Sequence, residues 1–267
     1  MNITGNTRLF AIIADPIKQV RTPEVLNEYF KEHKVDAVLV PIQVAAEDLE
    51  QTVQALRNMK NLDGFIVTVP HKSEITALCD ELGEAGAAIG AVNTVRRTSD
   101  GKLLGNMFDG TGFVSGLRTQ GHDPKKKRVL LLGAGGAAAA IAHALAEAGA
   151  AEIVITNRTL EKAQQLAERM QSLFPDVAIL AGENDPRGYD MVVNATSLGM
   201  KESDPLPVDA SLLEPKTVVA EIIMKPVVTA LLAAAQEREC AVHFGRHMLD
   251  EQVRLMAEFM LDPSDRI

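Results

Sequence analysis

The sequence predicts an α/β fold with two α/β modules and largely parallel sheets. Three observations lead to this expectation. The chain has 267 residues, enough for one large domain or two ordinary ones. Short apolar runs alternate with segments of helical periodicity, which is typical of strand–helix–strand units. A polar, proline-containing stretch at 121–127 lies between two such series and marks the best candidate boundary.

The first series reads as strand, helix, strand, helix, strand. Its predicted strands are runs of consecutive apolar residues, and its predicted helices carry apolar residues three or four positions apart. Pro70 follows the third strand and ends it. In chain order, the expected elements are a strand at Leu9–Ala14, a helix at Thr22–His33, a strand at Ala37–Pro41, a helix at Ala46–Met59 and a strand at Gly64–Val69.

The second series opens with a buried-type strand and continues with a glycine turn and an alanine-rich helix. The C-terminal helical segment is expected to pack back on the first module. In chain order, the expected elements are a strand at Arg128–Leu132, the turn and helix within Gly133–Gly149, a strand at Glu152–Thr156, a helix at Leu160–Leu173, strands at Val177–Leu180, Asp190–Asn194 and Thr217–Ile223, and a helix at Arg246–Met260.

Composition excludes several classes of protein. The formal net charge of -9 argues against a nucleic-acid binder that relies on phosphate contacts. The two cysteines, Cys79 and Cys240, provide neither a disulfide framework nor metal-ligand spacing, so no metal is expected. The longest apolar stretch, Ala137–Leu145, is too short to span a membrane, and no signal peptide is evident. We therefore expect a cytoplasmic protein without membrane or nucleic-acid partners.

A glycine turn between a strand and a helix is the sharpest local signal. It comprises Gly133, Ala134, Gly135, Gly136 and Ala137, with small Ala138 at the third fingerprint position. Such a turn lets the backbone approach a pyrophosphate, which the free N–H groups of the helix N-terminus then bind. The turn therefore predicts a Rossmann-type NAD(P)-binding domain. The alternative is a turn that only permits tight packing.

The end of the next strand indicates which nucleotide binds. An NAD site usually places an acid there to hold the ribose hydroxyls. This chain has Asn157, Arg158 and Thr159 instead, and a guanidinium with a hydroxyl is suited to a 2′-phosphate. We favour NADP as the cofactor, although NAD remains an alternative. These residues could also simply start the next helix, with Thr159 as its N-cap.

A lysine and several polar residues beside turn glycines form a second candidate site. Lys72 follows a strand of the first module, and ligands of parallel sheets bind beyond the carboxyl ends of strands. Asn93 and Asp109 follow in similar turns. A lysine there can donate or accept a proton or stabilise negative charge. A single lysine is otherwise more often a solvated surface residue.

Several ordered motifs resemble the shikimate dehydrogenase family over essentially the full chain. They occur in the family's order and at matching intervals. As they stand here, they are Gly64-Phe-Ile-Val-Thr-Val-Pro-His-Lys72, Gly90-Ala-Val-Asn-Thr94, Asp109-Gly-Thr-Gly-Phe113, Gly133-Ala-Gly-Gly-Ala137, Asn157-Arg-Thr159, Asn194-Ala-Thr-Ser-Leu-Gly-Met200 and Gly245-Arg-His-Met-Leu-Asp-Glu-Gln252.

The resemblance implies a function and assigns roles to residues. The family reversibly reduces 3-dehydroshikimate to shikimate with NADPH, in the shikimate pathway of aromatic amino acid biosynthesis. Residues 1–108, completed by a helix at 246–267, would form the substrate-binding catalytic domain, and residues 109–245 the NAD(P)-binding domain. The implied roles are catalysis for Lys72 and Asp109, substrate binding for Thr22, Thr68, Asn93 and Gln252, and cofactor binding for Thr196, Ile222 and Gly245 in addition to the two motifs above.

Departures from the family pattern put the substrate in question. Val20 and Met224 stand where the family has a serine and a tyrosine whose hydroxyls bind the substrate carboxylate. Arg21 or Lys225 could replace them. We therefore expect preserved hydride chemistry with weak affinity for shikimate, or a related substrate such as quinate or an amino-shikimate. A non-catalytic nucleotide-binding regulatory protein is the alternative from another class. A monomer and a homodimer are both compatible with the sequence.

Overall fold

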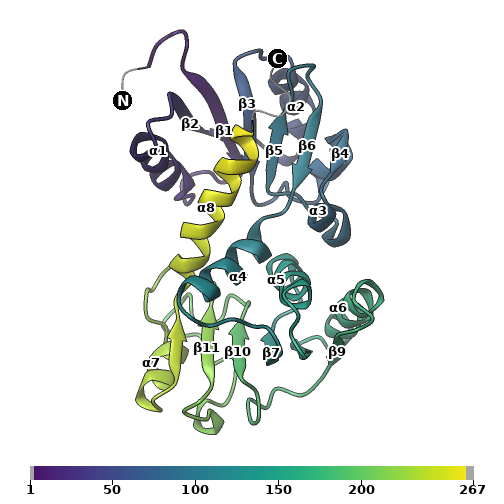
Figure 1. The fold of residues 1–267 in the computed structure, drawn as a ribbon, viewed down its shortest axis with the longest axis vertical. Helices are drawn as coiled ribbons and strands as arrows, with labels where there is room; N and C mark the ends of the chain where they lie inside the picture. Colours follow the sequence, from purple (N-terminus) through teal and green to yellow (C-terminus); the bar gives the residue numbers. More distant parts are fainter. Residues whose placement is uncertain (1–2, 263–267) are drawn as a thin grey trace. The chain divides into compact units, whose positions relative to one another are not determined.

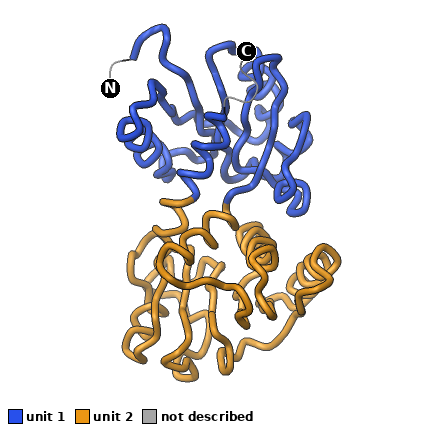
Figure 2. The backbone as a smooth tube through the Cα atoms, in the orientation of Figure 1, with its two compact units in different colours: residues 1–108, 252–267 blue, residues 109–251 orange. Residues whose placement is uncertain are grey.

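The computed structural model describes residues 3–262 and divides the chain into two compact units. Figure 2 shows them in blue and orange: the first comprises residues 1–108 and 252–267, and the second residues 109–251. The sequence predicts the return to the first domain at residue 246, whereas in the structure the first unit resumes at residue 252. Residues 263–267 of the predicted C-terminal helix lie outside the described residues.

The first unit contains a mixed six-stranded sheet in the order β2-β1-β3-β5-β6-β4 (Figure 1). Its first three strands are parallel, as predicted from their apolar runs. The next two pair antiparallel, which the sequence analysis did not predict. The strands are β1 (Arg8–Ala14), β2 (Ala37–Gln43), β3 (Leu62–Val67), β4 (Glu81–Leu82), β5 (Thr94–Arg97) and β6 (Leu103–Asn106).

Helices cover this sheet with their apolar faces. Val53 and Leu56 of α2 are buried in one core cluster with Phe65 of β3, which fixes the helix on the sheet. Removing such side chains from water is the main favourable contribution to the fold. The helices are α1 (Thr22–Glu32), α2 (Leu49–Arg57) and α3 (Glu84–Ile89), with 3₁₀ turns at Ala46–Asp48 and Glu74–Leu78.

The second unit is built on a fully parallel sheet in the order β12-β11-β10-β7-β8-β9. This is the doubly wound arrangement that the glycine turn predicted. Its strands are β7 (Arg128–Leu132), β8 (Glu152–Thr156), β9 (Ala178–Ala181), β10 (Met191–Asn194), β11 (Val218–Glu221) and β12 (Ala241–His243). Its helices are α4 (Asp109–Thr119), α5 (Gly136–Glu147), α6 (Leu160–Leu173) and α7 (Ala230–Glu237), with a 3₁₀ turn at Ala210–Leu212.

The last helix, α8 (Gly245–Leu261), carries the chain from the second unit into the first (Figure 1). The predicted α/β class with two α/β domains is confirmed. Among residues 3–262, no helix combines the length and apolar character that crossing a bilayer requires.

Candidate functional site

Thr68, Lys72 and Asn93 come together at one end of the first unit's sheet. Thr68 directly follows β3, and its N–H donates to the carbonyl of Ile13 at 3.1 Å. Because β5 runs antiparallel to β3, Asn93 before β5 lies beside the end of β3, and its carbonyl accepts from Val67 N–H at 2.8 Å. The Lys72 carbonyl accepts from Val92 N–H, also at 2.8 Å. The structure thus gathers three of the predicted residues.

The turn that bears Lys72 is anchored by a buried histidine. His71 has 1% of its surface exposed, and its Nε2 lies 2.8 Å from the carbonyl oxygen of Val44. The backbone N–H of His71 donates to the Thr68 carbonyl. Neighbouring Lys72 is only half-buried, so its long side chain remains accessible while its backbone is fixed. A fixed backbone reduces the conformational freedom that a catalytic amine would otherwise lose on substrate binding.

Asn93 is held in one orientation by its neighbours. It is buried, with 1% of its surface exposed. Its Oδ1 accepts from the Thr94 hydroxyl at 3.0 Å and from the Phe108 N–H at 3.1 Å. These donors identify the oxygen, so the amide nitrogen occupies the opposite position. A fixed amide donor suits recognition of a hydroxyl group.

Thr22 and Gln252 are the other predicted substrate residues of this unit. Thr22 is the first residue of α1 and Gln252 lies on α8, and both are partly buried. Arg21, which with Lys225 was one of two alternative carboxylate partners, pairs instead with Glu24 of α1, with Nε–Oε2 at 2.8 Å. Its guanidinium is therefore occupied by an acid in this structure.

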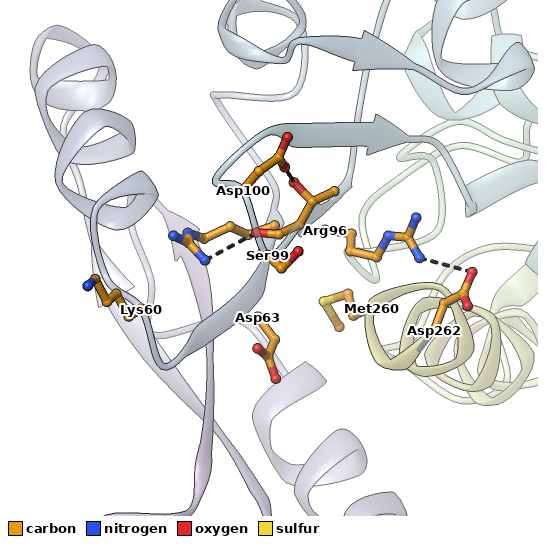
Figure 3. A pocket seen from close by; sticks show the side chains of 9 residues that line it. Lys60, Asp63, Arg96, Ser99, Asp100, Met260 and Asp262 are labelled. Carbon is orange, nitrogen blue, oxygen red and sulfur yellow. Dashed lines mark hydrogen bonds and ion pairs between the residues drawn. The ribbon is translucent and has the colours of Figure 1, made fainter. Parts of the chain in front are cut away.

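A cavity of about 530 Å³ occupies the other end of this sheet (Figure 3). Its lining includes Asp63 near the start of β3 and Arg96 near the end of β5. Arg96 pairs with Asp262, with Nη1–Oδ2 at 2.9 Å. Lys72 lies beyond the opposite end of β3, so this cavity is separate from the predicted catalytic lysine.

The glycine turn of the second unit has the geometry that a nucleotide site requires. Gly133 adopts φ +114°, which other residues rarely reach, and its N–H donates to the Thr156 carbonyl at 2.7 Å. A Cβ on Gly135 or Gly136 would meet no protein atom within 4 Å. The protein's own packing therefore does not demand glycine there, whereas the approach of a pyrophosphate would. With Ala134 and Ala137, these residues leave the N-terminus of α5 accessible.

The predicted adenosine-side residues lie beside this turn at the end of β8. The Gly133 N–H donates to the carbonyl of Thr156, the last residue of β8. Asn157, Arg158 and Thr159 directly follow Thr156 in the chain, which places them beside the turn. Arg158 is exposed, and no ion pair among residues 3–262 includes it. Thr159 occupies the N-cap position of α6, but its side chain makes no capping bond. An accessible guanidinium beside the turn fits a 2′-phosphate.

Asp109 begins α4 and belongs to the second unit. It is buried, with 5% of its surface exposed. A carboxylate in the first turn of a helix is stabilised by the positive end of the helix dipole. In the sequence, Asp109 is marked only by its motif, and no local pattern predicts the helix.

Thr196, Ile222 and Gly245 surround the carboxyl ends of β10 and β11. Thr196 lies in the loop after β10, Ile222 directly follows β11, and Gly245 begins α8. A Cβ on Gly245 would lie 2.7 Å from the Ile222 carbonyl carbon, so these two residues are immediate neighbours. All three lie in the same unit as the glycine turn.

The parallel sheet of the second unit and the glycine turn between β7 and α5 define the class of protein, a dinucleotide-dependent oxidoreductase with a Rossmann-type domain. The family described as "Shikimate dehydrogenase substrate binding domain" matches residues 12–95, and "Shikimate / quinate 5-dehydrogenase" matches residues 117–198. The chain belongs to the shikimate dehydrogenase family.

Named relatives agree with this family assignment. A shikimate dehydrogenase (NADP(+)) of Rubrobacter xylanophilus is 42% identical over 92% of this chain and 88% of its own. The shikimate 5-dehydrogenase of Listeria monocytogenes, solved with shikimate and NAD, has a TM-score of 0.91 and 34% identity over 98% of this chain and 94% of its own. The 5-ketofructose reductase of a Gluconobacter strain has a TM-score of 0.91 and 33% identity over 97% and 94%.

These matches confirm three predictions: the family, an oxidoreductase of the shikimate dehydrogenase type acting on CH–OH, and NADP as its cofactor. They do not assign individual site residues, whose roles remain proposals.

Proposed function

We propose that this enzyme reversibly reduces 3-dehydroshikimate, or a closely related cyclic keto acid, at its ring carbonyl. The observation that carries this proposal is the grouping of Thr68, Lys72 and Asn93 at the end of β3 in a chain of this family. Polar groups at the carboxyl ends of strands suit a small polyol substrate. The proposed compartment is the cytoplasm, and the proposed ligands are small molecules, with a monomer or homodimer as the assembly.

NADPH supplies the hydride when bound. We propose that Gly133–Ala137 hold its pyrophosphate, that Arg158 with Asn157 and Thr159 binds its 2′-phosphate, and that Thr196, Ile222 and Gly245 lie near its nicotinamide. The N-terminus of α5 presents backbone N–H groups that can bind an anion. These residues fit the cofactor because a Cβ on Gly135 or Gly136 would meet no other part of the protein within 4 Å, so a phosphate can approach the backbone there.

Lys72 and Asp109 form the proposed catalytic pair. As the carbonyl carbon gains hydride, negative charge grows on its oxygen, and the Lys72 ammonium stabilises this charge and donates a proton to give the hydroxyl. In the oxidative direction the neutral Lys72 amine accepts that proton. Asp109 accepts a hydrogen bond from a neighbouring substrate hydroxyl. Such proton transfer typically contributes about 10²–10⁴-fold in rate.

Thr22, Thr68, Asn93 and Gln252 are the proposed substrate-binding residues. Neutral donors and acceptors can fix ring hydroxyls without the desolvation penalty of further charges. The fixed Asn93 amide is suited to this role.

A second candidate substrate lacks the carboxylate. Val20 is partly buried and Met224 is 38% exposed, and neither side chain can donate a hydrogen bond to an anion. Arg21 is paired with Glu24. A neutral polyhydroxy ketone would need none of these contacts, and the structural match to a 5-ketofructose reductase favours this alternative.

The test is an initial-rate panel that follows absorbance of the reduced nicotinamide. Shikimate, quinate and an amino-shikimate are oxidised with NADP or NAD, and 3-dehydroshikimate and 5-ketofructose are reduced with NADPH. The proposal predicts the highest kcat/KM on the shikimate pair with NADP(H). A higher kcat/KM on 5-ketofructose would establish the neutral ketone instead. Absence of turnover on every substrate, together with nucleotide binding, would favour the regulatory protein.

A further inference from the structure

A buried carboxylate stands at the end of β11 and has no assigned role. Glu221 is the last residue of β11, and Asn194 is the last residue of the neighbouring strand β10. The two are partners in the parallel register, and both have none of their surface exposed. Two polar side chains thus end adjacent strands inside the second unit.

Glu221 joins two segments that are separate in sequence. Its Oε1 accepts from Asn194 Nδ2 at 2.8 Å, and its Oε2 accepts from the Thr229 hydroxyl at 2.6 Å. Thr229 in turn caps α7, since its Oγ1 accepts from Leu232 N–H at 3.2 Å. One carboxylate therefore fixes the end of β10 and the start of α7 relative to the end of β11.

Asn194 transmits this constraint into the loop after β10. Its Nδ2 also donates to the Leu198 carbonyl at 3.0 Å. Its Oδ1 accepts from Thr196 N–H at 3.1 Å and from the Thr196 hydroxyl at 2.7 Å. The Thr196 hydroxyl accepts from Leu198 N–H at 3.0 Å. One amide that Glu221 holds thus fixes Thr196 and Leu198 in this loop.

The constrained loops border the proposed nicotinamide residues and the glycine turn. A Cβ on Gly199 would lie 3.2 Å from Ile223 Cδ1 and 3.4 Å from Thr229 Cβ, so the two loops pack together. On the other side, a Cβ on Gly133 would lie 3.2 Å from the Thr196 methyl carbon, so the loop after β10 also adjoins the glycine turn. Displacing either loop would therefore disturb the surroundings of Thr196 and Ile222.

We propose that Glu221 is a positioning residue for the nicotinamide half of the cofactor, acting through Asn194 and Thr229 on the loops 195–200 and 222–228. This inference rests on the proposed function, which places the nicotinamide beside Thr196 and Ile222. Arg158, the proposed partner of the 2′-phosphate on the adenosine half, lies outside the network, whereas the glycine turn adjoins it at Gly133.

The chemistry of the network calls for a carboxylate. The Asn194 amide and the Thr229 hydroxyl each donate to one oxygen of Glu221, and both oxygens of an ionised carboxyl accept. A glutamine amide would replace one of these two acceptors with a donor. Burial raises the pKa of the Glu221 carboxyl, and no ion pair among residues 3–262 offsets its charge. An isolated buried charge lowers stability unless hydrogen bonds compensate it. The hydrogen bonds from Asn194 and Thr229 supply this compensation.

The test compares Thr229→Val, which removes the hydroxyl, with Thr229→Ser, which retains it, and with Glu221→Gln. A matched control is Thr217→Val. Thr217 is equally buried and lies just before β11 at its opposite end, where its hydroxyl donates to the Tyr189 carbonyl at 3.0 Å. Each variant is assayed for kcat, for NADPH affinity and for affinity towards 2′,5′-ADP, which contains only the adenosine half.

We expect Thr229→Val and Glu221→Gln to lower kcat and NADPH affinity at least about tenfold each, while 2′,5′-ADP affinity stays within about twofold of wild type. Thr229→Ser and Thr217→Val should retain both NADPH affinity and kcat. Each of three results would overturn the inference. These are a parallel loss of affinity for NADPH and for 2′,5′-ADP, equal effects of the valine and serine variants at position 229, and full NADPH affinity in Glu221→Gln.

The outcome separates this inference from the proposed function. The ratio of NADPH to 2′,5′-ADP affinity needs no turnover, so it reports on the network even if the proposed substrate is incorrect. Turnover of wild type with an unchanged ratio in the variants would refute the inference alone. Because Glu221→Gln preserves the shape of the side chain, it provides the readout if Thr229→Val does not fold.

Discussion

Gly110 of α4 lies so close to α5 that a Cβ on it would stand 1.9 Å from the Ala140 carbonyl oxygen. The close approach lets α4 pack directly against α5, the helix that begins at the glycine turn. Asp109, one residue before Gly110, is thereby fixed relative to Gly136. The proposed catalytic carboxylate and the proposed pyrophosphate site thus share one rigid helix pair.

Gly110→Ala should destabilise the protein by about 3 kcal/mol, since the added methyl group would meet backbone that can move only by separating the helices. The free energy of urea unfolding measures this effect. Gly135→Ala is the control, because a Cβ there meets no atom within 4 Å and should change the unfolding free energy by less than about 0.5 kcal/mol. Equal stability of the Gly110→Ala protein and wild type would contradict the close helix packing.

His243 should make stability depend on pH. Burial, with contributions from His247 and His122, lowers the pKa of His243 to about 3 from 6.5. The folded state therefore holds a neutral ring, while the unfolded chain takes up a proton below pH 6.5. The contribution of His243 to stability is present above pH 6.5 and is lost as pH falls towards 3. The free energy of unfolding decreases by about 2 kcal/mol between pH 7.5 and 5.

The measurement for His243 is the unfolding free energy of wild type and His243→Phe over that pH range. Phenylalanine preserves the edge-on ring contact with Phe113 but does not titrate. The wild type should lose about 2 kcal/mol more than the variant between pH 7.5 and 5. Identical slopes for the two proteins would show that His243 is not the responsible group.

Arg158→Glu should reverse the nucleotide preference. The substitution removes the proposed partner of the 2′-phosphate and adds a carboxylate that can bind ribose hydroxyls, so the ratio of kcat/KM for NADP over NAD should fall at least about 100-fold. Lys162→Glu makes the same charge change at an exposed site on α6 and should alter the ratio less than about threefold. Equal changes in both variants would indicate a general field effect instead of a contact at Arg158.

Val20→Ser should improve shikimate binding if the carboxylate lacks a hydroxyl partner at this position. A hydrogen bond to a charged group contributes about 1.5–3 kcal/mol, so KM for shikimate should fall about tenfold or more with kcat nearly unchanged. Val20→Ala tests whether smaller size alone explains a gain. If alanine and serine lower KM equally, the hydroxyl is irrelevant and the proposed reason for weak affinity is wrong.

The parts of the fold that the sequence predicted are those with strong local patterns. The apolar run Arg128–Leu132 and the helical periodicity of Leu160–Leu173 coincide with β7 and α6. By contrast, α4 contains three glycines within residues 110–116, which disfavour a helix locally. It forms because Gly110 and Gly116 permit close packing against other parts of the unit, a tertiary effect that periodicity does not report.

The antiparallel pair β5–β6 was missed for a related reason. Each strand has four residues, and β5 ends in two arginines, so neither produces an apolar run. Pairing with β3 then positions Asn93, which the sequence identified only by its motif.

The Glu221 network was also absent from the sequence analysis. The available signal was a polar residue ending each of two apolar strands, Met191–Asn194 and Val218–Glu221. Their adjacency depends on strand order, which the sequence did not specify.

The central claim is that Lys72 performs proton transfer in an NADP-dependent reduction, and Lys72→Met tests it most directly. Methionine retains the apolar length of the side chain but no amine. The measurement is kcat for NADPH-dependent reduction of the best substrate, alongside the dissociation constant for NADPH. We predict that kcat falls about 10²–10⁴-fold while NADPH affinity stays within about twofold of wild type. A kcat close to that of wild type, or a parallel loss of NADPH binding, would contradict the assignment.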